Sequence, residues 1–485
     1  MYPKSLHTVG RHPLLHQLWN DATSSLRIQI LEAINEIDWT SVDFLRVGLN
    51  GEYQITLMVA TRPDTLTWSH GHTVALRCKS ILEEHGIHDV PCEILEAVVH
   101  FHTDAKPKDY STGDSEAGTD SGSATFQLFS GPVSTRNSSK SDRVKDLTDR
   151  LGTNIATSQL NHVPSTKGLY VSIRPTGSGD EPQVSQPFKE IIQVDQDTYV
   201  RNLRYLEKES ESNGESDGEF SEDDQTRADA SSSDLDDNAM ILGRAMRSFR
   251  DSSSRVFGRL LYSPEFTVTS DHSGSTWIRD WALIELLPKS HQAAPSSIQN
   301  IVYLGTASTI VDCMDRNGEQ FERLLDLLEP LIKIGELKLQ RVAVPMEEIF
   351  AAPETEDVHE SGLLVGKYGA RGELSFGLGN TSKSVVRHVE TSEGGRETEW
   401  ITEEWAIIST TERRRRLWKE PDLQDCFARD GDYGSCVWDM QGRPAGILTA
   451  GSGFQHKMVT HVTYAQPLER LLKDIRSDGF DVEIF

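Results

Sequence analysis

The residues with the clearest chemical potential lie in one stretch near the C-terminus, Gly431-Asp432-Tyr433-Gly434-Ser435, followed by Cys436. Two glycines bracket a short polar turn, and an apolar strand, a glycine-containing hairpin and a second apolar strand follow it. This pattern predicts a bend that exposes the side chain of Tyr433 between strands. Cys436 falls inside the following apolar strand, so we expect a small buried hydrophobic residue there instead of a reactive thiolate.

A carboxylate stands at the start of another apolar run. Asp280 is followed by Trp281-Ala282-Leu283-Ile284-Glu285-Leu286. An apolar run of this length is typical of a strand that is buried on both faces. We therefore expect Asp280 at the entrance to a buried strand, with Ala282 and Ile284 in the core.

Together these stretches resemble chymotrypsin-like (trypsin-fold) serine peptidases, and in particular fungal intracellular ones. The turn resembles their nucleophile turn with tyrosine in place of serine, and 280–284 resembles their Asp-x-Ala-Leu-Ile motif. Residues 363–380 resemble a glycine-rich hairpin of the family, 446–451 the strand that lines the specificity pocket, and 462–475 the closing strand and C-terminal helix. The resemblance covers about two thirds of the chain, across residues 150 to 480.

The resemblance also assigns roles at the site. Asp280 takes the place of the carboxylate that orients the catalytic histidine, and Tyr433 takes the place of the nucleophile. The backbone N–H groups of Gly431 and Tyr433 take the place of the oxyanion hole. Asp432 is expected to cap nearby backbone N–H groups or to meet an arginine.

Two groups that acyl transfer requires lack a clear counterpart, because the chemistry needs a hydroxyl nucleophile and an imidazole base. The phenol of Tyr433 would fill the space where the scissile carbonyl lies. His162 is a doubtful base, since it precedes the Gly168-Leu169-Tyr170 strand that it should follow. Ser435 is a weak candidate for a shifted nucleophile, since the family places a small packing residue there. Nucleophile and base contribute non-additively, so losing both removes the reaction.

The composition of the chain argues against several classes of function. The net charge of -26 argues against a nucleic-acid or anionic-membrane binder. Five cysteines are widely spaced without metal-ligand patterns, so we expect no metal, no cofactor and no disulfide framework. No signal peptide and no long apolar span are evident, so we expect a cytoplasmic protein with a nuclear location left open. Residues 413–416 are four arginines, interpreted as a solvated loop.

The chain divides by composition into three parts. Residues 1–103 predict a small α/β (α+β) domain, and the Ser/Thr/Asp/Gly-rich residues 104–145 a disordered linker. Residues 146–485 are expected to form the chymotrypsin-like double six-stranded β-barrel with a C-terminal helix, so the fold class is mainly β. Within it we expect a disordered acidic insert at 206–238, because residues 207–237 hold thirteen acidic and two basic residues. A helix is predicted over 321–336.

The sequence therefore favours a catalytically inactive peptidase homologue that binds a protein or peptide partner. One alternative is an active or self-processing serine endopeptidase with a rearranged site. The other is that the N-terminal module is the effector and the barrel senses a ligand. The oligomeric state is not readable from the sequence.

Overall fold

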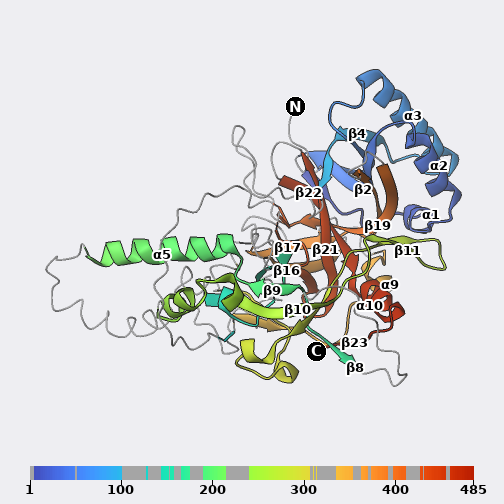
Figure 1. The fold of residues 1–485 in the computed structure, drawn as a ribbon. Coiled ribbons are helices and arrows are strands. Elements are labelled where there is room, and N and C mark those ends of the chain that lie inside the picture. The colour runs from blue at the N-terminus through green and yellow to red at the C-terminus, as the bar shows by residue number, and fades with distance from the viewer. Residues whose placement is uncertain are drawn as a thin grey trace.

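The computed structural model describes seventeen stretches of the chain, and its β content confirms the prediction of a mainly β protein. Figure 1 shows a large sheet region with the N-terminal helices at one end and helix α5 (Gln196–Gly214) projecting at the other. Among the described residues, no helix is long and apolar enough to cross a membrane. The described residues are 5–49, 52–100, 127–128, 144–151, 153–157, 165–174, 189–214, 240–305, 310, 313, 335–352, 362–369, 373–391, 397–410, 426–429, 431–454 and 459–485.

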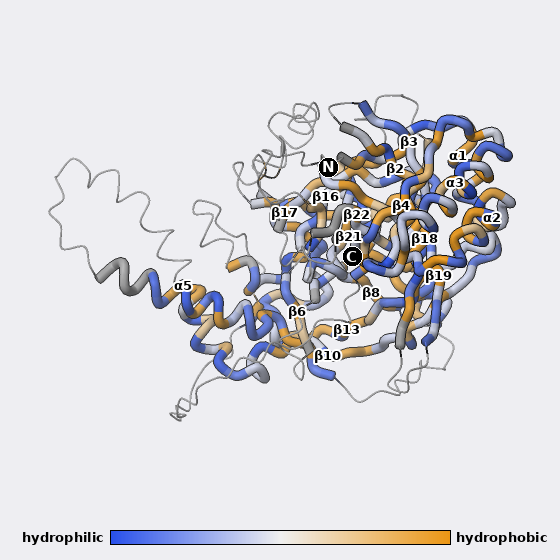
Figure 2. The backbone as a smooth tube through the Cα atoms, turned by 90° about the horizontal axis from the view of Figure 1, so that it is seen from above, coloured by the Kyte–Doolittle hydropathy of each residue, from blue (hydrophilic) through white to orange (hydrophobic). Residues whose placement is uncertain are grey.

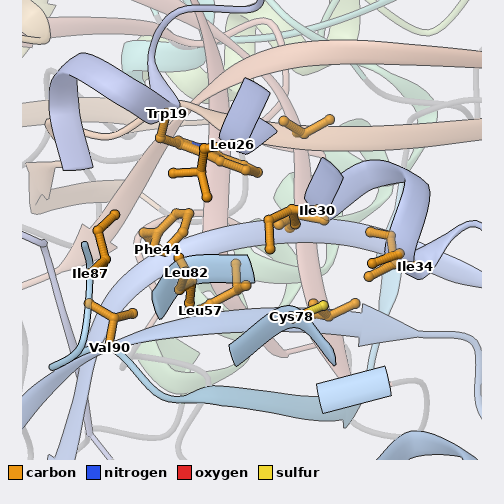
Figure 3. Close-up of a cluster of buried hydrophobic side chains, with 14 of the residues drawn as sticks. Trp19, Leu26, Ile30, Ile34, Phe44, Leu57, Cys78, Leu82, Ile87 and Val90 are labelled. Atoms are coloured by element: carbon orange, nitrogen blue, oxygen red, sulfur yellow. The ribbon is translucent and has the colours of Figure 1, made fainter. Parts of the chain in front are cut away.

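The N-terminal unit packs three helices on a short sheet. Its elements are β1 (Ser5–His7), α1 (Leu15–Trp19), α2 (Ser25–Ile34), β2 (Trp39–Leu49), β3 (Glu52–Thr61), α3 (Trp68–Glu84) and β4 (Cys92–Glu96). Helices α2 and α3 start after residues whose hydroxyls cap them, since Ser24 accepts from the Arg27 N–H and Thr67 from the His70 N–H. Figure 3 shows apolar side chains from the helices and from the sheet packed in one core, which includes Trp19, Phe44 and Leu82.

This sheet continues into the C-terminal part of the chain. Strand β18 (Ser384–Thr391) pairs with β2 through Val385 opposite Val42, and also with β19 (Glu397–Ser409). A buried charge cluster supports the junction, because both Arg27 Nη1 and Lys383 Nζ lie 2.7 Å from Glu403 carboxylate oxygens. The predicted domain boundary at 103 lies outside the described residues, but the sheet itself spans both predicted domains.

Six strands of the C-terminal part form a continuous ring of pairings. In order these are β17–β16, β16–β20, β20–β21, β21–β22, β22–β19 and β19–β17, so the last pairing returns to the first strand. Interior side chains such as Val365, Trp405, Val437 and Ala465 form one apolar cluster. The remaining bounds are β16 (Leu363–Gly369), β17 (Glu373–Gly379), β20 (Cys436–Asp439), β21 (Pro444–Phe454), β22 (Val459–Pro467) and α10 (Leu468–Ser477).

Smaller sheets precede this ring in the sequence. A five-stranded sheet has the order β13-β10-β9-β6-β7, and three two-stranded sheets pair β11 with β12, β14 with β15, and β8 with β23. The bounds are β6 (Asn154–Thr157), β7 (Ser165–Thr166), β8 (Val171–Arg174), β9 (Glu190–Gln193), β10 (Val256–Tyr262), β11 (Thr267–Ser270), β12 (Thr276–Arg279), β13 (Leu283–Leu286), β14 (Ile301–Tyr303), β15 (Glu336–Lys338), α9 (Met346–Ile349) and β23 (Asp481–Ile484).

The prediction of a strand buried on both faces after Asp280 is wrong. Of the run 281–286 only Leu283–Leu286 form a strand, β13, and residues 280–282 lie between β12 and β13, which join different sheets. Ala282 precedes β13 and is exposed, and within β13 Leu283 is buried whereas Ile284 and Leu286 are half-buried. The run therefore forms one short, half-buried strand.

Helix α5 (Gln196–Gly214) extends into the start of the acidic segment that the sequence assigns to disorder. Figure 2 shows hydrophobic and hydrophilic positions alternating along it, and Tyr199, Leu203 and Leu206 contribute to one apolar cluster. An apolar stripe that packs on the protein accounts for the helix despite its charge. The rest of the insert, most of the predicted linker, and residues 321–334 of the predicted helix lie outside the described residues.

Candidate functional site

The turn at 431–435 forms as the sequence predicts. Gly431 and Gly434 adopt φ values of 93° and 80°, which are favourable only for glycine. The N–H of Asp432 donates to the Arg429 carbonyl at 2.9 Å, and the N–H of Ser435 donates to the Asp432 carbonyl at 3.0 Å. The two glycines therefore allow a tight bend that internal hydrogen bonds close.

Asp432 holds this bend to the neighbouring strand β16. Its Oδ2 accepts from Lys367 Nζ at 2.6 Å and from the Arg429 N–H at 3.0 Å. Both side chains of the ion pair are fully buried, and burial lowers the pKa of Lys367. A Cβ at Gly369 would lie 2.3 Å from Asp432 Oδ1, so the strand needs glycine at that point. Asp432 thus caps a local N–H, which is the first of the two expected alternatives, and it also pairs with the charge of Lys367.

The Tyr433 side chain points into the protein, which corrects the prediction that the bend exposes it. Its exposed fraction is 2 %, and it belongs to the apolar cluster inside the six-strand ring, with Trp405, Phe427 and Leu448. The N–H of Gly434 donates to the Leu448 carbonyl at 2.9 Å, which ties the turn to β21. An aromatic ring is more stable in this apolar interior than in water, so Tyr433 contributes to the core.

The outer side of the bend is covered by the segment that follows β6. Thr166 Oγ1 donates to the Gly431 carbonyl at 2.7 Å, and the Thr166 N–H donates to the Tyr433 carbonyl at 3.3 Å. Gly168 packs so closely that a Cβ there would lie 2.6 Å from the Gly434 carbonyl oxygen. The bend is therefore enclosed on both sides. The oxyanion-hole-like role of the N–H groups at Gly431 and Tyr433 stays a prediction.

The two neighbouring candidate nucleophiles are also buried. Ser435 has no exposed surface, and its hydroxyl donates to the carbonyl of Asp432. Burial raises the pKa of the Cys436 thiol to about 12, which keeps it protonated at neutral pH. Neither side chain has the activated, accessible environment of a nucleophile.

Asp280 lies at a different place, beside the carboxyl group of Glu404. Its side chain is exposed, but protein surrounds it on most sides and this burial raises the pKa of its carboxyl. Among the described residues, no hydrogen bond or ion pair reaches the Asp280 carboxylate. Burial and the nearby Asp280 charge raise the pKa of Glu404 to about 8. Two threonine hydroxyls contact the fully buried Glu404, with Thr449 Oγ1 at 3.0 Å and Thr402 Oγ1 at 3.3 Å.

Asp280 and Tyr433 therefore face opposite sides of strand β19. Trp405 packs with Tyr433 inside the ring, and Glu404, the residue before it, interacts with Asp280. Successive side chains of a strand point to opposite faces of the sheet. The fold places Asp280 and Tyr433 near the same strand but does not turn their side chains toward each other.

Two buried histidines escaped the sequence analysis. His291 Nδ1 lies 2.6 Å from Asp149 Oδ1, and this pair lies near Lys167, whose pKa burial lowers to about 7. His388 Nε2 lies 2.7 Å from Thr402 Oγ1, and burial lowers the pKa of His388 to about 4. The partners of both histidines are distant in the sequence, so no local pattern indicates these contacts. Only the alternation of residues within 384–391 could have suggested that His388 faces inward. His162 lies outside the described residues.

Comparisons with known proteins found no match to this chain. No protein-family model matches the chain, and a search of curated proteins returned no match. Within the described stretches of the chain, no group of three or more His, Cys, Asp or Glu side chains is arranged to hold a metal ion. The functional interpretation therefore depends on the geometry of the turn and of Asp280.

Proposed function

We propose that this protein is a catalytically inactive relative of the trypsin-like serine peptidases that acts by binding other proteins. The observation that carries the proposal is the burial of Tyr433 inside the six-strand ring. A nucleophile must reach a substrate carbonyl, and a side chain packed against Trp405 and Leu448 cannot do so.

The strand pairings support the fold assumed in this proposal. The ring formed by β16, β17, β19, β20, β21 and β22 corresponds to the second barrel of the double-barrel architecture, with α10 as its C-terminal helix. The five-stranded sheet with β13 and β10 corresponds to part of the first barrel. Asp280, at the start of the β13 region, then occupies the place of the orienting carboxylate without an imidazole bonded to it among the described residues.

A direct test treats the full-length protein with a fluorophosphonate probe and, separately, with a casein-type substrate, using trypsin as the positive control. We expect neither labelling nor turnover, in the protein or in its Ser435→Ala variant. Labelling that disappears in Ser435→Ala, or casein turnover that disappears in His162→Ala, would refute catalytic inactivity and support the rearranged endopeptidase.

A further inference from the structure

Helix α5 packs against a second helix, at 240–248, through an apolar seam. The hydroxyl of Tyr199 in α5 donates to the carbonyl of Met246 in the second helix at 3.3 Å. The buried side chains of the second helix and the residue after it recur at every third or fourth position, and they are Leu242, Ala245, Met246 and Phe249. Each helix therefore turns one face inward, and its opposite face is left to solvent.

Basic residues occupy the exposed positions of this helix pair. Stretches 196–208 and 240–250 hold six basic residues and two acidic ones, Asp197 and Glu207, so their net charge is +4 in a chain of net charge -26. All six basic side chains are exposed, and they are Arg201, Arg204 and Lys208 on α5, and Arg244, Arg247 and Arg250 on or just after the second helix. We call these six side chains the basic surface.

The basic surface has no carboxylate partner within the part of the chain that the structure describes. None of its six side chains forms an ion pair with a described residue. Arg201 Nη2 donates to Thr198 Oγ1 at 3.2 Å, but this hydroxyl on the same helix carries no charge. Like charges three or four positions apart on a helix, such as Arg204 and Lys208, destabilise it. A counter-charge at this surface would therefore stabilise the helix pair.

The chain carries such a counter-charge between the two helices. Residues 215–239, which lie outside the described residues, connect the end of α5 at Gly214 to the start of the second helix at Met240. They hold ten acidic residues and one basic residue, Arg227. Single exposed ion pairs are weak, but this segment is attached at both ends to the helices that carry the basic surface. Its effective concentration there is on the order of millimolar, so several weak pairs can act together.

We infer that the basic surface is the docking surface for residues 215–239 of the same chain, which bind it through ion pairs between their carboxylates and the guanidinium and ammonium groups. Five of the six cations are arginines, whose planar guanidinium groups accept carboxylates in a bidentate arrangement. The contact neutralises the helix pair and withholds its positive charge from other anions. This inference is independent of the proposed function, because it uses no residue of the turn at 431–435 and no external partner.

Trypsin cleavage after Arg227 measures this contact in the full-length protein, because Arg227 is the one basic residue of the segment. Proteolysis follows the population of the open form, so Arg244→Gln/Arg247→Gln should speed this cleavage by at least about fivefold at low salt. At about 1 M NaCl, where charges are screened beyond about 3 Å, both proteins should be cleaved at the same rate. Lys338→Gln/Arg341→Gln, at two exposed cations elsewhere, is the matched control and should leave the rate unchanged. Mass spectrometry identifies the fragment that ends at Arg227.

A second variant leaves both helices unchanged and replaces the ten acidic residues of 215–239 by their amides. A fluorescein-labelled peptide with the original sequence of residues 215–239 is then added at low salt. It should bind this amide-substituted protein at least about tenfold more tightly than the original protein, whose surface is already occupied. It should not bind the amide-substituted protein that also carries Arg244→Gln/Arg247→Gln, and a peptide with the ten amides should bind none of them. Circular dichroism establishes that each variant is folded.

Three results would overturn the inference. They are equal cleavage after Arg227 with and without Arg244→Gln/Arg247→Gln at low salt, no peptide binding to the amide-substituted protein, and protection of Arg227 that falls when the protein is diluted. The last result would assign the acidic segment to the basic surface of a second copy. None of these assays measures peptidase chemistry of the protein, so failure here is distinguishable from failure of the proposed catalytic inactivity.

Discussion

Lys367 Nζ lies 2.6 Å from Asp432 Oδ2, with both side chains fully buried, and this pair joins strand β16 to the turn that carries Tyr433. Removing one partner of a buried ion pair leaves an uncompensated charge in the interior. We therefore expect Lys367→Met to lower the free energy of unfolding by about 3 to 5 kcal/mol, measured by urea denaturation.

Two further variants test the origin of this loss. Lys338→Met, at an exposed lysine, should change the free energy of unfolding by less than about 0.5 kcal/mol. The double variant Lys367→Met/Asp432→Leu should recover part of the loss, because it removes both charges. A Lys367→Met protein as stable as the Lys338→Met protein would contradict this account.

Replacing Tyr433 by the serine that the resemblance expects should destabilise the protein without creating activity. Tyr433→Ser removes a ring packed with Trp405 and Leu448, and large-to-small changes of this kind cost about 3 to 5 kcal/mol. Tyr433→Phe keeps the ring and should lose much less. Thermal unfolding and fluorophosphonate labelling measure the two effects, and a stable, labelled Tyr433→Ser protein would show that the ring is not a core element.

The close contact at Gly168 predicts sensitivity to a single methyl group. Because a Cβ would lie 2.6 Å from the backbone oxygen of Gly434, Gly168→Ala should cost about 1 to 3 kcal/mol. Gly243→Ala is the control, since its Cβ would meet nothing closer than 3.6 Å, and within a helix it should stabilise by about 0.5 to 1 kcal/mol. Urea midpoints that fall equally for both would contradict the proposed contact between Gly168 and the turn.

The sequence predicted those local structures that are determined by residues adjacent in the chain. Glycines at 431 and 434 predict the bend because only glycine adopts their φ values easily. It could not predict the direction of the Tyr433 side chain, because Trp405 and Leu448 decide that direction from other strands. It also missed the His291 pair with Asp149, which lie 142 residues apart in the sequence.

The surroundings of Asp280 and the pairing of β18 also depend on residues that are distant in the sequence. The apolar run after Asp280 predicts one strand buried on both faces, but only Leu283–Leu286 form a strand, which is half-buried, and Ala282 is exposed. Composition alone places a boundary near residue 103, whereas pairing of β18 with β2 joins the sheet across the two predicted units. Long-range strand pairing has no local sequence signal beyond alternation.

The last prediction concerns pH and the buried Glu404. Its pKa is raised from 4.5 to about 8, so between these values the folded protein binds more protons than the unfolded chain. The stability that Glu404 contributes is therefore fully present below about pH 4.5 and is lost as the pH rises through about 8. His388 acts in the opposite sense, because its lowered pKa makes its contribution complete above pH 6.5 and lost as the pH falls through about 4.

Glu404→Gln isolates the first effect, because glutamine keeps the shape of the side chain and cannot ionise. The difference in free energy of unfolding, Glu404→Gln minus the original protein, should rise between pH 5 and 8 by at most about 1.4 kcal/mol per pH unit. Urea denaturation at half-unit pH steps measures it. Glu399→Gln, at an exposed carboxylate beside Arg387, is the matched control for the chemical change itself. A flat difference for Glu404→Gln would mean that Glu404 is already ionised in the folded protein at pH 5, and that its buried contacts with Thr402 and Thr449 favour the carboxylate.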